Sequence, residues 1–214
     1  MLKVGLTGGI AVGKSVVGEM FVALGAHLVQ ADRIAHSLMQ PGEAVYNEVV
    51  GHFGRGILNP DGSVNRAKLA EVAFGTAADE GQTTSRVEQL NRIVHPAVIR
   101  SQEEWMNAIG VQDRHAVAIV EAALILEAGA GKRFDRLVVV TCREEQRVAR
   151  FAARLKITLE EAHKEVTRRM AAQLPDDEKI KAADFVIDNS GSLEQTRRRV
   201  GEVWKSLHES AQSS

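Results

Sequence analysis

The sequence predicts an α/β protein in which a parallel sheet of five short strands is flanked by helices. Apolar runs rich in β-branched residues, at 116–121 and 136–141, are typical of strands buried on both faces. Stretches with the helical spacing of apolar residues separate these runs, which implies right-handed crossovers between parallel strands. The chain also opens with a strand, a glycine-rich turn and a helix. These observations favour a fold in which the first turn holds a phosphate chain.

The glycine-rich turn matches the phosphate-binding pattern G-x-x-x-x-G-K-[ST] at Gly8 and at 13–15. Glycines let backbone N–H groups turn inward, and the following helix N-terminus adds unpaired donors and a partial positive charge. Lys14 can reach the β- and γ-phosphates of a nucleoside triphosphate, and the Ser15 hydroxyl is placed to ligate Mg²⁺. A turn that binds nothing is disfavoured by the strand before it and the helix after it, so we expect the P-loop NTPase fold. The residues predicted to bind the nucleotide here are Gly9, Ile10, Ala11, Val12, Gly13, Lys14, Ser15 and Val16.

A long, mostly helical stretch follows the second predicted strand, which we place at 25–32 and expect to end in Asp32. Its apolar spacing predicts helices that are broken by turn signals and by proline. Ligands bind at the carboxyl ends of the strands in such sheets, so we interpret residues 33–95 as a helical acceptor-binding insert. In order, we expect a helix at 33–50 interrupted at Pro41-Gly42, turns at 53–62, a helix at 65–74, a polar loop at 75–85, and a helix at 86–94 that kinks or restarts at Pro96.

The second half of the chain contains the other strands and a candidate lid. Arg143, Arg147, Arg150 and Arg154 recur at spacings of four, three and four, so they lie on one face of a helix. Facing the phosphate-binding loop, these arginines could neutralise charge on a transferring phosphoryl group. The alternative is a solvated helix with salt bridges to Glu144, Glu145 and Glu165. The phosphate-binding loop favours a lid at about 143–179, between strands at 116–121, 136–141 and 185–188.

Two carboxylates are candidates for the chemistry. Asp32 could accept the proton of an acceptor hydroxyl during attack on the γ-phosphate, or it could simply cap the helix that follows. Its place at the sheet edge favours catalysis. Glu121, at the end of an apolar strand, could hold Mg²⁺ through water or could support another ligand.

Composition limits the other possibilities. The 214 residues fit one compact domain, with a nucleotide-binding core at about 1–32, 96–142 and 180–208 and a frayed tail at 209–214. With 27 basic and 28 acidic residues, the chain is not expected to coat nucleic acid. Cys142 is the single cysteine, no apolar run is long enough for a membrane span, and a strand at the first residues leaves no room for a signal peptide. We therefore expect a cytoplasmic protein, monomeric or weakly self-associating.

Several ordered motifs resemble the dephospho-CoA kinase family, from the first strand to about residue 200. They are the loop at 7–15, Ala31-Asp32, Pro41-Gly42, Phe53-Gly54, Asp61-Gly62 with Arg66, Leu90 to His95-Pro96, 124–127, Gln173-Leu-Pro175 with Lys179, and 183–189. The sequence departs from the family at Gln30, where an aspartate is frequent, and at Leu155, where Arg154 is usually followed by aspartate.

The resemblance implies transfer of the γ-phosphate of ATP to the ribose 3′-hydroxyl of dephospho-CoA, with Mg²⁺ as cofactor. It implies that Asp32 is the acid–base residue, and that Lys14 and Arg150 act on the phosphates. It also implies ATP contacts from Arg147 and from Asn189 near the adenine, and acceptor contacts from the insert. The implied acceptor-binding residues are Asp32, His95 and Glu127.

Three other interpretations stay open from the residues alone. Another small-molecule kinase would share ATP and the lid and would differ in what the insert binds. A nucleotide-binding switch is the second, although no Asn-Lys-x-Asp guanine motif and no Leu-Ser-Gly-Gly-Gln transporter signature are present. A nucleic-acid binder is the third, disfavoured by the balanced charge and an aromatic content of 4%.

Overall fold

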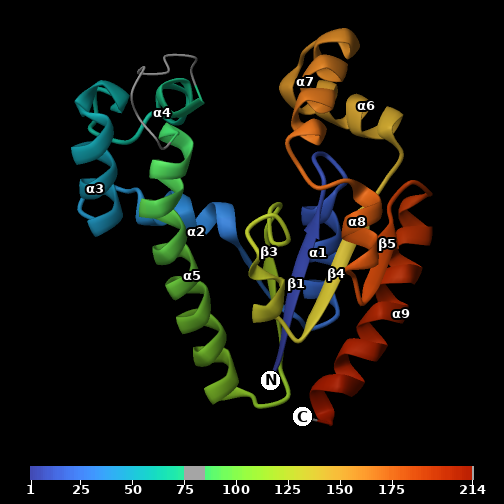
Figure 1. Cartoon of the computed structure of the whole chain (residues 1–214). Coiled ribbons are helices and arrows are strands. Elements are labelled where there is room, and N and C mark those ends of the chain that lie inside the picture. The colour runs from blue at the N-terminus through green and yellow to red at the C-terminus, as the bar shows by residue number, and fades with distance from the viewer. Residues whose placement is uncertain (75–84, 214) are drawn as a thin grey trace. The chain divides into compact units, whose positions relative to one another are not determined.

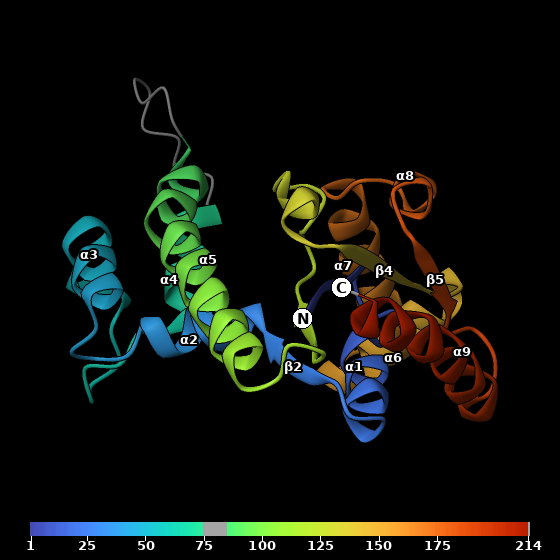
Figure 2. The same cartoon turned by 90° about the horizontal axis from the view of Figure 1, so that it is seen from below.

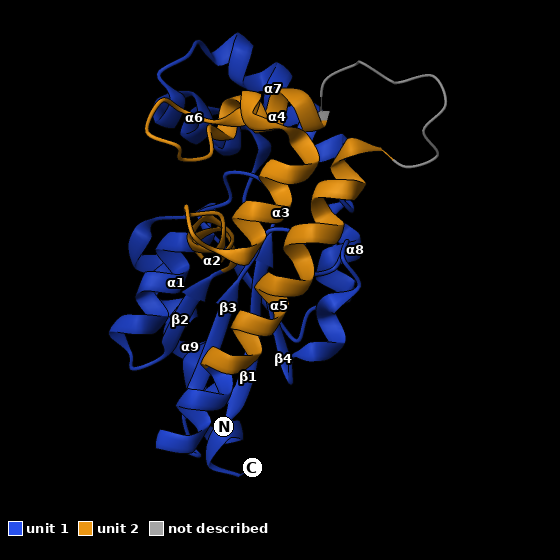
Figure 3. Cartoon of the chain, turned by 90° about the vertical axis from the view of Figure 1, so that its left-hand side faces the viewer, with its two compact units in different colours: residues 1–30, 106–214 blue, residues 31–105 orange. Residues whose placement is uncertain are grey.

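A computed structural model describes residues 1–74 and 85–213, so most of the polar loop expected at 75–85 lies outside the described residues. The chain divides into two compact units (Figure 3). The core unit comprises Met1–Gln30 and Met106–Ser214, and the helical unit comprises Ala31–Trp105. The helical unit is ten residues longer at its C-terminal end than the insert expected at 33–95.

The core unit contains the predicted parallel sheet (Figure 1). Its strands are β1 (Leu2–Gly8), β2 (His27–Gln30), β3 (Val117–Glu121), β4 (Arg136–Thr141) and β5 (Phe185–Asp188). They lie in the order β2-β3-β1-β4-β5, and every pair is parallel. The register pairs Gln30 with Glu121 and Thr141 with Asp188, so the carboxyl ends of the strands meet at one edge. The predicted fold class is confirmed.

Helices cover both faces of this sheet (Figure 2). One face packs against α1 (Lys14–Ala23) and α9 (Leu193–Gln212) in the main apolar cluster, to which Phe21 and Leu207 contribute fully buried side chains. The other face is covered by residues 122–134, which include η2 (Ala130–Arg133), and by α8 (Asp176–Lys181). Helices α6 (Glu144–Leu155) and α7 (Leu159–Ala171), which form most of the predicted lid, lie beyond the carboxyl ends of the strands (Figure 1). The edge that carries the phosphate-binding loop therefore also carries the segment predicted to be a lid.

The C-terminal segment differs from the sequence prediction. A frayed tail was expected from Glu209, but α9 continues to Gln212 and Ala211 is fully buried in the main apolar cluster. The carbonyl of Ala211 also accepts a hydrogen bond from His115 Nδ1 at 3.2 Å. The expectation was wrong because the residues around Ala211 are polar, so the sequence does not reveal that the last turn of the amphipathic helix α9 buries Ala211.

The helical unit is built from α2 (Ala31–Leu38), α3 (Ala44–Phe53), η1 (Arg55–Ile57), α4 (Arg66–Phe74) and most of α5 (Arg86–Gln112). Its own apolar cluster is centred on Val45, Val49, Ile57 and Leu69. The interruption at Pro41-Gly42 and the turns near 53–62 are confirmed. This unit has a core of its own and can present side chains from several helices.

Two boundaries in this region need correction. The second strand ends at Gln30, and Asp32 lies in the first turn of α2 and not at the end of a strand. Helix α5 runs through Pro96 without a break. Pro96 is exposed, so the carbonyl that loses its helical partner can face water, while Val94 and Val98 on either side are buried in the apolar cluster. Among the residues that the structure describes, no helix has both the length and the apolar character that a membrane crossing needs.

Candidate active site

The phosphate-binding loop has a backbone that only glycine can adopt at two of its positions. Gly8 has φ 150° and Gly13 has φ 91°. A Cβ on Gly8 would lie 2.3 Å from the carbonyl oxygen of Val140, and one on Gly13 would lie 2.3 Å from Nδ2 of Asn189. Helix α1 then begins at Lys14 with no side chain capping its N-terminus. Its first backbone N–H groups thus have no side-chain acceptor, which suits binding of an anion.

Lys14 lies folded over the loop. Its Nζ donates hydrogen bonds to the carbonyl oxygens of Gly8 and Gly9, both at 2.9 Å. Two loop carbonyls thus hold the ammonium group above the phosphate-binding turn. A phosphate oxygen there would exchange these neutral acceptors for a charged one, and such charge-assisted hydrogen bonds are stronger.

Oxygen-bearing side chains gather beside the first turn of α1. Ser15 Oγ donates to Glu121 Oε1 at 2.8 Å, and Gln30 Nε2 donates to Glu121 Oε2 at 2.8 Å. Glu121 is 8% exposed. A hydroxyl and a carboxylate next to a phosphate site are the hard oxygen donors that Mg²⁺ prefers, so these residues fit that ion. Gln30, an apparent departure from the family pattern, has the role of orienting Glu121.

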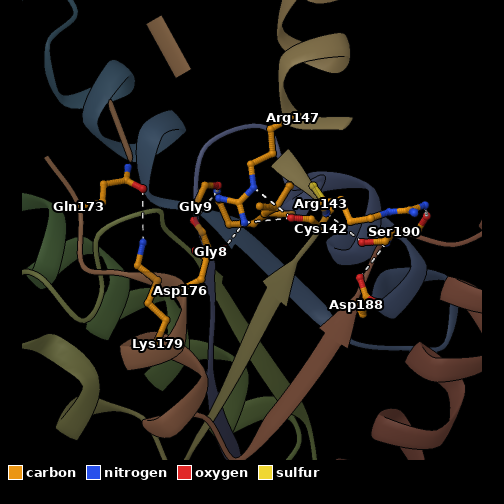
Figure 4. A network of polar contacts seen from close by, with 12 residues as sticks. Gly8, Gly9, Cys142, Arg143, Arg147, Gln173, Asp176, Lys179, Asp188 and Ser190 are labelled. Carbon is orange, nitrogen blue, oxygen red and sulfur yellow. Dashed lines mark hydrogen bonds and ion pairs between the residues drawn. The ribbon is translucent and has the colours of Figure 1, made fainter. Parts of the chain in front are cut away.

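The four arginines predicted to lie on one face of α6 point in several directions. Arg150 Nη1 donates to the carbonyl of Val12 at 3.2 Å, and Arg150 Nη2 donates to that of Asn189 at 2.9 Å. Arg143 donates to Ser190 (Figure 4). Arg154 differs from the expectation, because its guanidinium lies 5.3 Å from the ring centroid of Phe151 and not at the loop.

The alternative of a solvated, salt-bridged α6 is therefore wrong. Glu165, one of the expected partners, instead pairs with Arg168 at 2.8 Å and Arg169 at 2.6 Å on its own helix α7. These hydrogen bonds, led by that of Arg168, lower the pKa of Glu165 to about 2. Helix α7 thus carries surface ion pairs, whereas Arg147 and Arg150 of α6 turn inward.

Arg147 is the most buried of the arginines, at 2% exposed. Its Nε and Nη2 donate to the carbonyl of Cys142 at 3.2 and 3.1 Å, and Nη2 also forms an ion pair with Asp176 of α8 (Figure 4). Burial raises the pKa of the Cys142 thiol, an effect partly offset by the positive charge of Arg147. Sequence reasoning placed Arg147 at the ATP site but missed Asp176, because nothing in the spacing links residues 29 positions apart.

Asn189 and Glu127 are both engaged within the protein. Asn189 Nδ2 donates to the carbonyl of Val12 at 2.8 Å, and its Oδ1 accepts from Thr196 at 2.9 Å. The side chain therefore braces the phosphate-binding loop, a role that the sequence did not reveal. Glu127 Oε1 forms an ion pair with Lys179 at 3.0 Å and accepts from the backbone N–H of Leu174 at 3.2 Å. Glu127 thus ties the segment that returns from the lid to the loop after β3.

The remaining predicted residues, Asp32 and His95, belong to the helical unit. Asp32 is exposed, and as the second residue of α2 it is not the N-cap that the alternative interpretation required. Along the chain it follows by two residues Gln30, the partner of Glu121. His95 is exposed on α5.

Comparisons with known proteins agree on one family. A family model described as dephospho-CoA kinase matches residues 2–195. The dephospho-CoA kinase of Aquifex aeolicus is 39% identical over 207 residues, which cover 97% of this chain and 98% of that protein. The crystal structure of TT1252 from Thermus thermophilus superposes with a TM-score of 0.74 at 28% identity, covering 96% of this chain and 97% of that one. A dephospho-CoA kinase from Campylobacter jejuni has the same fold, with a TM-score of 0.68 at 24% identity over 97% of this chain and 98% of its own.

Proposed function

The chain belongs to the dephospho-CoA kinase family, and on this basis we propose how its residues divide the work of the reaction. The enzyme phosphorylates dephospho-CoA, the last step of coenzyme A biosynthesis. The observation that carries this function is the match of the family model over residues 2–195, which includes the phosphate-binding loop and the lid. We propose that it is a single-domain cytoplasmic kinase, monomeric or weakly self-associating, with core, insert and lid as parts of one domain.

ATP is proposed to bind with its phosphates against residues 9–16 and the N-terminus of α1. Lys14 would exchange the carbonyls of Gly8 and Gly9 for oxygens of the β- and γ-phosphates. Arg147 and Arg150 add positive charge: Arg150 already contacts the loop at Val12, and Arg147 contacts Cys142, the residue that follows β4. In this arrangement Asn189 acts mainly by bracing Val12, with the adenine near the same segment.

Mg²⁺ would be held by Ser15 and Glu121 together with phosphate oxygens, and it would neutralise part of the charge on the phosphates. Gln30 keeps the Glu121 carboxylate in place through its hydrogen bond to Oε2. This leaves Ser15 as the residue whose hydroxyl must turn from Glu121 towards the ion.

Asp32 is proposed as the general base. Its carboxylate would take the proton from the ribose 3′-hydroxyl as that oxygen forms a bond to the γ-phosphorus, and the bond from the γ-phosphorus to the bridging oxygen breaks to release ADP. Support comes from its exposed carboxylate and from its place in the chain two residues after Gln30. The helical unit, with His95, is proposed to bind the acceptor. Of the two carboxylate oxygens of Glu127, only Oε2 is proposed to contact the phosphoryl-acceptor substrate. Oε1 already forms an ion pair with Lys179, whereas Oε2 has no hydrogen-bond partner among the described residues.

The decisive experiment compares acceptors. Release of ADP from ATP and Mg²⁺ would be measured with dephospho-CoA and, separately, with adenosine, AMP and shikimate, and the product would be checked by mass. Turnover with dephospho-CoA alone, with CoA formed, is the expected result. Turnover with another acceptor and none with dephospho-CoA would contradict the proposal while leaving the ATP site intact.

A further inference from the structure

Asp176 is an acidic residue at the edge of the phosphate-binding loop that the reaction described above does not use. It begins α8, on the segment that returns from the lid, whereas its partner Arg147 lies on α6, the segment that enters the lid. The Arg147–Asp176 ion pair therefore joins the two ends of the lid at its base. The side chain of Asp176 is 30% exposed and that of Arg147 only 3%.

The guanidinium of Arg147 has hydrogen-bond partners on one side and none among the described residues at Nη1. Nε and Nη2 donate to the carbonyl of Cys142, and Nη2 also donates to Asp176. Nη1 is buried and has no hydrogen-bond partner among the described residues. A buried donor without a partner is costly, so an acceptor that reaches Nη1 would bind with a gain in free energy.

The direction of Nη1 points to what that acceptor is. A Cβ built on Gly9 would lie 2.7 Å from Nη1, so this nitrogen lies against the backbone of the phosphate-binding loop (Figure 4). Gly9 occupies a variable position of the loop motif, and its φ does not demand glycine. The lack of a side chain at Gly9 is explained instead by the close approach of Arg147.

We propose that Asp176 is a positioning residue for ATP: with the carbonyl of Cys142 it fixes the Arg147 guanidinium so that Nη1 faces the loop and donates to a phosphate oxygen. This inference rests on the proposed binding of ATP at the loop. Asp176 itself does not touch the nucleotide and acts through Arg147. Its negative charge also offsets the cost of keeping Arg147 charged while buried.

The test compares Asp176→Asn with Asp177→Asn, which removes the same charge from an exposed neighbour. ATP affinity would be measured by calorimetry without acceptor, together with the KM for each substrate and the melting temperature. Because the ion pair is reduced to a hydrogen bond between the charged guanidinium and a neutral amide oxygen, Arg147 is held less firmly, and Asp176→Asn is expected to weaken ATP binding about tenfold. Its KM for dephospho-CoA should stay near that of the wild type, and Asp177→Asn should bind ATP normally. The melting temperature of Asp176→Asn should fall because buried Arg147 loses its counter-charge, so ATP binding is measured well below that temperature.

A double-mutant cycle separates positioning from a direct effect. In an Arg147→Gln background, or Arg147→Lys if the first variant does not fold, Asp176→Asn should weaken ATP binding no further. Gly9→Ala should also weaken ATP binding, because its methyl group would displace Nη1.

Three outcomes would overturn the inference: tighter ATP binding in Asp176→Asn, which would mean that the carboxylate competes with phosphate; independent effects of Asp176 and Arg147; or a loss explained by a lower melting temperature alone. Because ATP binding is read without acceptor, these results do not depend on the acceptor being dephospho-CoA. Failure of the acceptor assay would contradict the proposed function and leave the role of Asp176 standing.

Discussion

At the scale of single residues, the phosphate-binding loop is held by side chains from distant parts of the chain. The carbonyl of Val12 accepts hydrogen bonds from Arg150 on α6 and from Asn189 after β5. Gly13 lets Asn189 approach closely, since any side chain there would collide with Nδ2. The loop is therefore pre-organised before ATP arrives, which lowers the entropy cost of binding its phosphates.

Replacing Asp32 with asparagine tests the proposed base at the same scale. Asparagine keeps the size of the side chain but cannot take a proton, so kcat should fall roughly 10²–10⁴-fold. ATP affinity should stay unchanged, because the proposed nucleotide contacts lie elsewhere. Rapid-quench measurement of CoA formation and calorimetric ATP binding would report the two quantities. Glu48→Gln, at another exposed acid of the helical unit, serves as the control, and near-normal turnover in Asp32→Asn would exclude it as the base.

At the scale of elements, α6, α7 and α8 use charge in different ways. Arg147 and Arg150 of α6 reach inward to backbone carbonyls, and Arg147 also reaches Asp176. On α7 the acidic and basic residues pair with one another at the surface. Helix α8 buries Lys179, which is 1% exposed and pairs with Glu127. The predicted lid therefore has a mostly solvated outer helix, α7, and a base fixed by the ion pairs of Arg147 with Asp176 and of Lys179 with Glu127.

The buried pair of Lys179 and Glu127 should matter strongly for stability. Lys179→Met leaves the Glu127 carboxylate without its counter-charge, and removing one partner of a buried pair costs about 3–5 kcal/mol. The double variant Lys179→Met/Glu127→Leu removes both charges and should recover most of that loss. Urea unfolding of the three proteins would measure the free energies. A single variant as stable as the wild type would show that the pair contributes nothing.

The ion pairs of Glu165 with Arg168 and Arg169 on α7 should contribute a small, pH-dependent amount to the free energy of unfolding. The folded-state pKa of Glu165, about 2, lies below its ordinary value of 4.5, so its stabilising effect is complete above pH 4.5 and is lost as the pH falls towards 2. Arg168 is 68% exposed, and solvent screening limits the effect to less than about 1 kcal/mol. The stability difference between wild type and Glu165→Gln should shrink between pH 6 and pH 3. Glu160→Gln, at a more exposed pair on the same helix, is the control, and a constant difference would refute this linkage.

At the scale of the whole molecule, the sequence predicted the strands and the phosphate-binding loop, which local patterns of residues mark. It did not predict the side-chain contacts between distant segments. Apolar runs locate all five strands, and the glycine spacing locates the loop. Contacts of Arg147 with Asp176, of Asn189 with Val12 and of Glu127 with Lys179 could not be predicted, because they join segments with no common periodicity. The resemblance to a family indicated that these segments matter, and the structure shows their physical partners within the core unit.

The last turn of α9 allows a final test of whether the C-terminal residues stabilise the core unit. Deleting residues 209–214 removes buried Ala211 from the main apolar cluster and the acceptor of the His115 hydrogen bond. These two losses should reduce the free energy of unfolding by about 1–3 kcal/mol, a fall in melting temperature of about 2–4 °C for each kcal/mol in a chain of this size. Deleting only 213–214 keeps Ala211 and should leave the melting temperature unchanged. Equal stability of the two truncated proteins would mean that the end of α9 is frayed after all, as its polar sequence first indicated.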